Sequence, residues 1–266
     1  MPTVLSSKGN DIDAWRPAAD FVASFRQSLL DKSTDLTSGA AEEMFLKVGQ
    51  ELEKLATENE AALADMQSLM EDAANIFEPA QLGEVIRKFY HACYAMFARS
   101  RSAIAFYRLS QRFLNVVAAS LLTSARVRLD IPDDKFRSMV LIALGPAGRR
   151  EYSPFSGLKM LLVTDITDES ETQLPLMIGE TLHQLFEETG LLIDKVITPR
   201  NPEWCMNLTP WCQKLAVKPK KGDEEKLFNL LQLADQTTIV SGNTKGDDFC
   251  SLCLPLLRKN HELVSF

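Results

Sequence analysis

The sequence predicts an α+β protein: a mostly helical chain with a small mixed β-sheet flanked by helical regions. Residues 15–128 place apolar side chains at helical spacing and contain little proline or glycine. After Pro132, short apolar runs typical of buried strands alternate with a helical segment. We therefore expect three regions: a helical region over 1–130, an α/β domain over 131–200 and a C-terminal helical region over 201–266.

The first region contains three predicted helical segments, over residues 15–33, 40–77 and 83–129. The first has a proline near its start, where the missing N–H costs nothing, and phenylalanines and leucines then follow at helical spacing. Pro79 closes the second segment. The third is expected to break at residues 100–102, where polar residues interrupt its apolar stripe.

Three strands are predicted in the central region, over Met139–Leu144, Leu158–Thr164 and Leu191–Thr198. A helix over residues 171–188 joins the second strand to the third. This alternation indicates a small mixed sheet with helices packed on it. In the last region, the expected helix starts are marked by Asn201, followed by Pro202 at the first helical position, and by Asp223.

The chain is acidic and has no apolar segment of membrane-spanning length. It has 29 Lys and Arg residues against 36 Asp and Glu residues, a net charge of -7. That balance gives no broad electrostatic reason to bind nucleic acid or an anionic membrane. Its apolar runs, such as Met139–Leu144, are far shorter than the roughly 20 residues of a bilayer span. We expect a cytoplasmic protein that binds neither nucleic acid nor membrane.

Five cysteines form an odd set, so we expect reduced thiols. Cys250 and Cys253 have C-x-x-C spacing, and with Cys205 and Cys212 they could complete a four-thiolate zinc site. The favoured alternative is that the C-x-x-C pair belongs to a buried helix face. The histidines are far apart in sequence and are expected to be satisfied or exposed rather than catalytic: His91, His183 and His261.

Charge is unevenly distributed between the predicted helices. Residues 42–72 hold nine acidic residues against two lysines, whereas residues 84–128 hold eight basic residues against one glutamate. The arginines of the second segment could line a cleft for an anionic ligand. The alternative, which we favour, is that two solvated helix faces complement each other.

The segment with the most chemical information lies at the junction between the first two predicted strands. Gly145 and Gly148 directly follow the first strand, and glycine lets the backbone approach a phosphate closely. Free N–H groups at such a turn can donate to phosphate oxygens. Arg149 and Arg150 come next and could pair with the same anion.

Together these residues resemble the signature of the nucleotidyltransferase superfamily that includes DNA polymerase beta. Gly145 matches its first glycine, and Gly148 and Arg149 with Glu151 match its glycine-arginine-x-glutamate element. Ser156 matches the residue before its aspartate pair. The pattern is most similar to the PII uridylyltransferase domain and to the nucleotidyltransferase-like domains found beside CBS domain pairs in bacterial signalling proteins.

The resemblance continues toward the C-terminus. Asn201, Trp204 and Trp211 resemble a tryptophan-containing stretch of the CBS-associated family, and Leu233–Asp235 resembles its later aspartate segment. The similarity covers roughly residues 83–266. It implies a nucleotidyltransferase-like α/β domain followed by a helical region similar to those that bind substrate. The N-terminal helices occupy the place where relatives carry regulatory domains.

The departure from the family lies at its metal site. The family holds Mg²⁺ with two aspartates at positions i and i+2 of the second strand, whose side chains share one face. Here the matching positions are Gly157 and Lys159. A glycine offers no ligand, and a protonated lysine cannot coordinate a hard cation. The remaining candidates for a metal ligand are carboxylates: Glu151, Asp165 and Asp194.

The resemblance therefore implies a catalytically degenerate nucleotidyltransferase-like protein with a regulatory, nucleotide-sensing or protein-binding role. The residues expected to contact a nucleotide are Gly145, Gly148, Arg149, Arg150, Ser156 and Lys159. Lys159 could replace a metal as a point charge, or be an exposed lysine in a decayed pocket. One alternative is an active enzyme that transfers a nucleoside monophosphate to a protein and needs Mg²⁺; another is a purely structural protein whose helical regions bind a protein partner or a second copy.

Overall fold

The computed structural model describes residues 39–100, 102–165, 173–216 and 230–241, and the single positions Gln27, Phe249, Ser251 and Pro255. The chain forms two compact units that meet in sequence between Gln67 and Ser68. Apart from Gln27, the predicted first helix lies outside the described residues, as do the Asp223 cap and the Cys250 and Cys253 pair. The predicted region boundaries near residues 130 and 200 stay predictions. Among the helices that the structure describes, none is long and apolar enough to cross a bilayer.

Long helices make up the first part of the described chain, as predicted. They are α2 (Gly39–Asn75), α3 (Pro79–Ser100) and α4 (Ala103–Arg128). Pro79 begins α3, where a proline loses no helical hydrogen bond. The break predicted at residues 100–102 is confirmed, because Ser102 caps α4 by accepting a hydrogen bond from the Ala105 N–H at 3.3 Å.

The basic residues of α3 and α4 are solvated or paired locally. Arg108 and Arg112 are exposed on α4. Arg126 forms an ion pair with Asp133 and donates to the Ile131 carbonyl at 3.2 Å. This arrangement agrees with solvated helix faces rather than with arginines converging on one anion.

A four-stranded mixed sheet follows, in the order β3-β2-β1-β4. Its strands are β1 (Val140–Leu144), β2 (Lys159–Thr164), β3 (Cys205–Asn207) and β4 (Thr237–Ser241). The central strand β1 pairs antiparallel with both β2 and β4, whereas β2 pairs parallel with β3. The predicted α+β class is confirmed.

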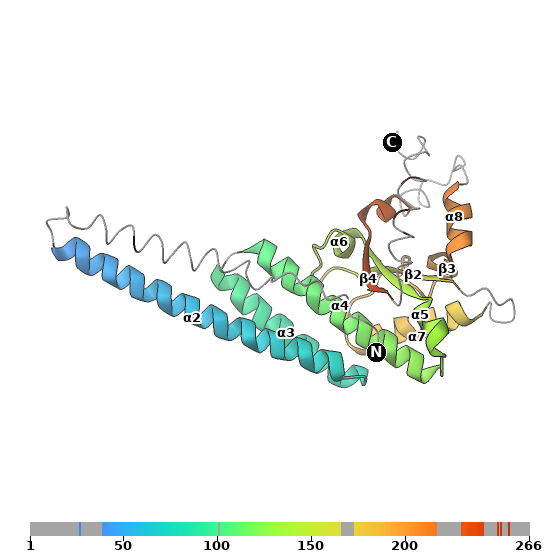
Figure 1. Ribbon diagram of the computed structural model, residues 1–266, viewed down its shortest axis with the longest axis horizontal. Coiled ribbons are helices and arrows are strands. Elements are labelled where there is room, and N and C mark those ends of the chain that lie inside the picture. The colour runs from blue at the N-terminus through green and yellow to red at the C-terminus, as the bar shows by residue number, and fades with distance from the viewer. Residues whose placement is uncertain are drawn as a thin grey trace. The chain divides into compact units, whose positions relative to one another are not determined.

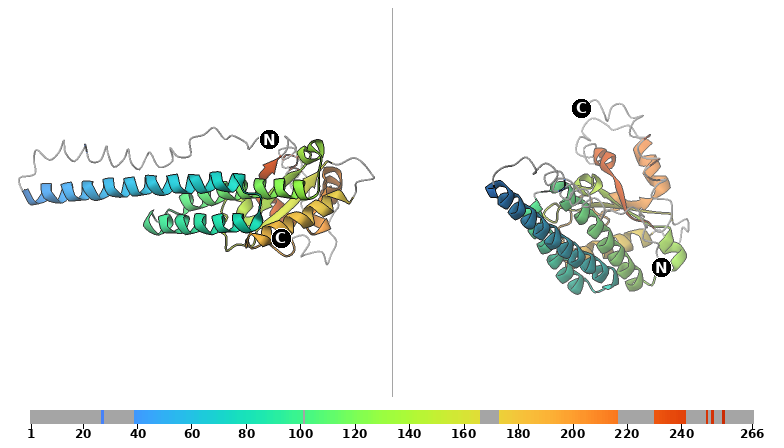
Figure 2. Two further views of the ribbon diagram at one scale, coloured as in Figure 1. Left: turned by 90° about the horizontal axis from the view of Figure 1, so that it is seen from below. Right: turned by 60° about the vertical axis from the view of Figure 1, so that its left-hand side comes forward.

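Both faces of the sheet are covered. Every residue of β1 is buried, so its side chains alternate between two apolar layers. One face packs against α4 and α7 (Leu174–Glu188), and the opposite face packs against α8 (Leu208–Ala216), as Figures 1 and 2 show. The layer beneath α8 contains Trp204 and Trp211, whose ring centroids lie 5.7 Å apart with the ring planes tilted by 51°. Both tryptophans are buried and belong to the core of this layer.

Two sequence-based predictions about strands are wrong. The segment Leu191–Thr198 forms no strand; only Ile193 makes a bridge, to Leu158. Asp194 turns the chain there, because its carboxylate accepts the N–H groups of the residues two and three positions later. Conversely, β3 and β4 lie in the region predicted to be helical. Each strand is short and is stabilised by pairing with β2 or β1, so its own sequence gives little signal of it.

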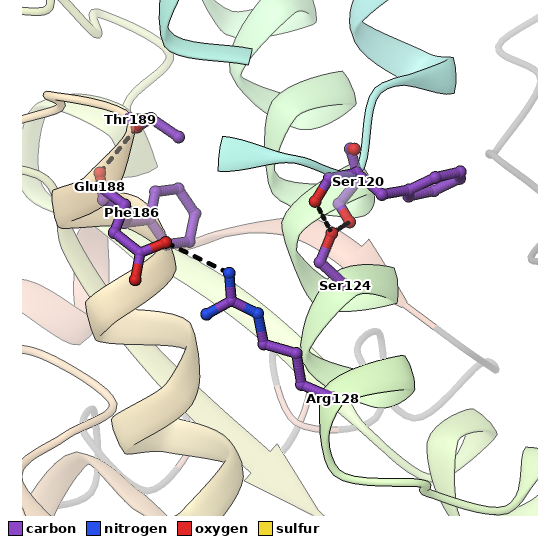
Figure 3. Close-up of polar contacts among 7 residues, drawn as sticks. Ser120, Ser124, Arg128, Phe186, Glu188 and Thr189 are labelled. Carbon is purple, nitrogen blue, oxygen red and sulfur yellow. Dashed lines mark hydrogen bonds and ion pairs between the residues drawn. The ribbon is translucent and has the colours of Figure 1, made fainter. Parts of the chain in front are cut away.

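Two serines on α4 hold the connection between α2 and α3. Ser124 donates to the Phe77 carbonyl at 2.8 Å and to the Ser120 carbonyl at 3.1 Å, and Ser120 donates to the Ile76 carbonyl. Figure 3 shows the hydrogen bonds of Ser124 and, nearby, the ion pair between Arg128 of α4 and Glu188 of α7, whose nitrogen and oxygen lie 3.2 Å apart. Carbonyls left over at the end of a helix need such donors. The two serines therefore cap carbonyls that lie just beyond the end of α2, from a neighbouring helix.

Replacing Ser124 by alanine is expected to lower the free energy of unfolding by about 1–2 kcal/mol, because a carbonyl loses its buried donor. Urea denaturation measures this change. The control is Thr123→Ala, whose hydroxyl bonds only to the preceding turn of its own helix and whose replacement favours the helix. Equal losses for the two variants would contradict the capping role.

Candidate functional site

The residues that resemble the nucleotidyltransferase signature lie between β1 and β2. The first strand ends at Leu144, and the short helix α6 (Gly145–Gly148) follows directly; we call these four residues the signature turn. Gly145 has a φ of 59°, which an L side chain rarely adopts. Because Leu144 pairs with Lys159 across the sheet, the start of β2 lies beside this turn.

Lys159 lies over the signature turn and is bonded within the chain. A Cβ on Gly145 would lie 3.5 Å from Lys159 Cδ and 3.4 Å from Gln232 Oε1. The half-buried ammonium donates to Gln232 Oε1 at 2.8 Å. The lysine that stands here in place of a family aspartate therefore makes a hydrogen bond within the chain. Gln232 begins the 3-10 helix η5 (Gln232–Asp235), which directly precedes β4.

The other end of the signature turn also contacts η5. A Cβ on Gly148 would lie only 1.5 Å from the Asp235 carbonyl oxygen, so only glycine fits there. Arg149 donates through Nη1 to Asp235 Oδ2 at 2.6 Å and through Nε to Glu151 Oε2 at 3.0 Å. These hydrogen bonds, with Asp235 contributing more, raise the pKa of Arg149. Gly148 and Arg149 thus both hold η5 against the turn.

Arg150 has a strained backbone. Its φ is 63°, and it follows α6 at the position where helices usually place a glycine. The N–H of Glu151 reaches back to the Pro146 carbonyl at 2.7 Å and that of Arg150 to the Ala147 carbonyl at 3.1 Å, which is a Schellman motif. The side chain of Arg150 is exposed. A positive φ at a non-glycine residue destabilises the folded state, and an exposed side chain does not offset this strain by packing.

We expect Arg150→Gly to raise the free energy of unfolding by up to about 1 kcal/mol, since glycine adopts a positive φ without strain. Thermal and urea denaturation measure the change. The matched variant is Arg108→Gly, an exposed arginine inside α4, which is expected to lose about 1 kcal/mol. A loss of stability in both variants would mean that the Arg150 side chain contributes a stabilising contact.

The carboxylates near the turn do not form a site for Mg²⁺. Glu151 is bound by Arg149, and Asp194 accepts the N–H groups of Val196 and Ile197 at 2.9 and 2.7 Å. Asp165 follows the far end of β2, about 20 Å along the strand from its start. Among the residues that the structure describes, no three His, Cys, Asp or Glu side chains are placed to share a metal ion. The residues present do not fit the family's metal pair.

Ser156 and Gly157 lie in the loop before β2. The N–H of Ser156 donates to the Ser153 carbonyl at 2.9 Å, which closes a turn. Gly157 is exposed, and a Cβ there would lie 3.7 Å from the Asp194 backbone nitrogen. The structure thus brings Asp194 next to one of the two family metal positions, with its carboxylate engaged in a backbone turn.

Two buried titratable groups elsewhere, His183 and Cys205, are held by hydrogen bonds within the chain. His183 is buried, with Nδ1 2.7 Å from Thr198 Oγ1 and Nε2 3.3 Å from a Glu187 oxygen, so the expectation of a satisfied histidine is confirmed. The Cys205 thiol donates to the Pro175 carbonyl, and burial raises its pKa to about 12. A thiol held protonated is a poor nucleophile and metal ligand.

The structure brings four of the predicted nucleotide-binding residues to one place: Gly145, Gly148, Arg149 and Lys159. Sequence reasoning missed that η5 would contact all four. Asp235 stood out only as part of a later segment similar to the family, and Gln232 did not stand out at all. A carboxylate and an amide far from the turn in sequence give no local signal of their contact with it.

Comparison with known proteins supports the resemblance. The family model described as "Putative nucleotidyltransferase DUF294" matches residues 87–225, about half of the chain. The match includes the signature turn, β2 and the Trp204 and Trp211 stretch, and it ends before η5. A search of curated proteins finds no match.

Proposed function

This chain belongs to the family described as "Putative nucleotidyltransferase DUF294", and from that membership we propose that it is a catalytically inactive member with a regulatory role. The proposal rests on the residues that stand at the two positions where the family has metal-binding aspartates. Gly157 has no side chain to offer, and Lys159 places an ammonium where a carboxylate is needed. A two-metal displacement requires carboxylates that hold both ions.

The neighbouring carboxylates do not replace the missing pair. Glu151 neutralises Arg149, and Asp194 stabilises a backbone turn. Recruiting either one to a metal would first break the bonds that it already makes, and a single carboxylate would still not supply the pair that holds two ions in a two-metal site. A cation would also be repelled by the ammonium of Lys159.

A second candidate within this proposal is nucleotide sensing. Lys159 Cδ lies 3.5 Å from the Cβ position of Gly145, so the side chain that carries the ammonium runs beside the turn. An ammonium can pair with phosphate as a point charge without a metal. The alternative role, binding a protein partner or a second copy through the helices, uses none of these residues.

The test is titration calorimetry of ATP, UTP, GTP and CTP, each with Mg²⁺ and with EDTA, together with a transfer assay using α-labelled nucleotides. We expect no transfer of label and no requirement for Mg²⁺ in binding. Label transfer, or Mg²⁺-dependent binding that is lost in Glu151→Gln, would overturn the proposal of an inactive member.

The variant Lys159→Ala separates the two regulatory roles. Metal-independent binding that falls at least about tenfold in Lys159→Ala would support nucleotide sensing through this ammonium, because charged hydrogen bonds contribute that much. The control is Lys88→Ala, an exposed lysine on α3. Equal affinity of wild type and Lys159→Ala would exclude sensing through Lys159, and absence of binding would favour a role in protein contacts.

A further inference from the structure

The signature turn is covered by the chain's own η5. Two of the cations beside the turn, Lys159 and Arg149, are bonded to this one element, to Gln232 at 2.8 Å and to Asp235 at 2.6 Å respectively. The backbone of η5 approaches the turn so closely that the Asp235 carbonyl oxygen occupies the space of a side chain at Gly148. Both the side-chain hydrogen bonds and the close backbone approach therefore hold η5 against the signature turn.

The acceptors on η5 have the chemistry of an anionic ligand. A carboxylate and a carboxamide oxygen accept hydrogen bonds from guanidinium and ammonium groups, as phosphate oxygens do. Asp235 also presents a negative charge to Arg149, and a phosphate would present a negative charge in place of Asp235. Arg149 and Asp235 are 44% and 38% exposed, so water reaches this ion pair and an external anion can compete for it.

We propose that η5 is an internal competitor for the cations of the signature turn, so that a phosphate-containing anion and η5 bind Lys159 and Arg149 in alternation. The inference rests on the proposed function, since it treats the turn as a ligand site without catalysis. β4 begins two residues after Asp235 and pairs with β1 at the edge of the sheet. Displacement of η5 by an anion therefore loosens the pairing of β4.

The first experiment titrates inorganic pyrophosphate into the full chain by calorimetry. Asp235→Asn removes the competing charge, and Gln232→Ala removes the acceptor of Lys159. Each variant is expected to bind pyrophosphate about fivefold more tightly than wild type, since each loses one competing contact. The control is Glu188→Gln, which removes an exposed ion pair between α4 and α7 and is expected to leave the affinity unchanged.

The second experiment follows hydrogen exchange in the wild-type chain, so that the inference does not depend on how Asp235→Asn folds. Saturating pyrophosphate is expected to speed exchange of the Thr237–Ser241 amides severalfold while β1 and β2 stay protected. Unchanged exchange in β4, equal affinity of wild type and both η5 variants, or no binding of pyrophosphate to any of them would overturn the inference. Transfer of nucleotide label would instead contradict the inactive role, and it is measured separately.

Discussion

Gly148→Ala is expected to destabilise the unit from Ser68 onward by more than about 3 kcal/mol. The new methyl group would lie 1.5 Å from the Asp235 carbonyl oxygen and 3.0 Å from the Ala143 carbonyl oxygen. Both neighbours are backbone atoms, so relief requires η5 to move away from the signature turn. That movement would break the Arg149 ion pair as well. Urea denaturation measures the loss.

The matched control for Gly148→Ala is Gly157→Ala. At Gly157 the nearest neighbour of a Cβ is 3.7 Å away, which is ordinary van der Waals contact. We expect this variant to change the free energy of unfolding by less than about 1 kcal/mol, with a gain as the favoured direction because alanine restricts the unfolded chain. If the two variants were equally stable, η5 would not pack on the turn as described.

The stability of the folded chain is expected to fall steeply above pH 9. Burial raises the pKa of the Cys93 thiol to about 11 and that of Cys205 to about 12, from a usual value of 9.0. A group whose pKa is raised by folding contributes stability that is present below its unfolded pKa and is lost as pH rises. Between pH 9 and 11 the unfolded chain ionises both thiols, whereas in the folded chain Cys205 stays mostly protonated and Cys93 ionises only as the pH approaches 11.

The expected loss over that range is about 3–5 kcal/mol, because each thiol contributes about 1.4 kcal/mol per pH unit. Burial also raises the pKa of the Tyr90 and Tyr152 hydroxyls, which extends the loss to higher pH. The measurement is the urea midpoint at pH 8, 9, 10 and 11 under reducing conditions. Cys205→Ala should flatten the dependence, whereas a wild-type midpoint that stays constant to pH 11 would contradict it.

The long helices were predictable because their signals are local and repeat over many residues. The break before α4 follows from Ser102, whose hydroxyl caps the next turn without help from the rest of the fold. The strands β1 and β2 were predictable for the same reason, since each is a continuous buried apolar run. By contrast, β3 has three residues and β4 five, and each depends on a partner that is distant in sequence.

The candidate site was predictable in part. Gly145, Gly148 and Arg149 stood out because they match a family signature, and the substitutions at Gly157 and Lys159 could be recognised from the same match. Asp194 was placed on a strand, but its side chain bonds with nearby backbone N–H groups, and that local bond favours a turn.

The sequence by itself determined the helical class and the two central strands, because residue type and spacing alone decide those features; the resemblance to the family assigned Gly157 and Lys159 to its metal positions. Only the tertiary structure decided what the signature turn contacts. The bonds from Arg149 to Asp235 and from Lys159 to Gln232 join residues 86 and 73 positions apart. Such contacts depend on how β4 pairs with β1, and pairing between distant segments leaves no periodic pattern in the chain.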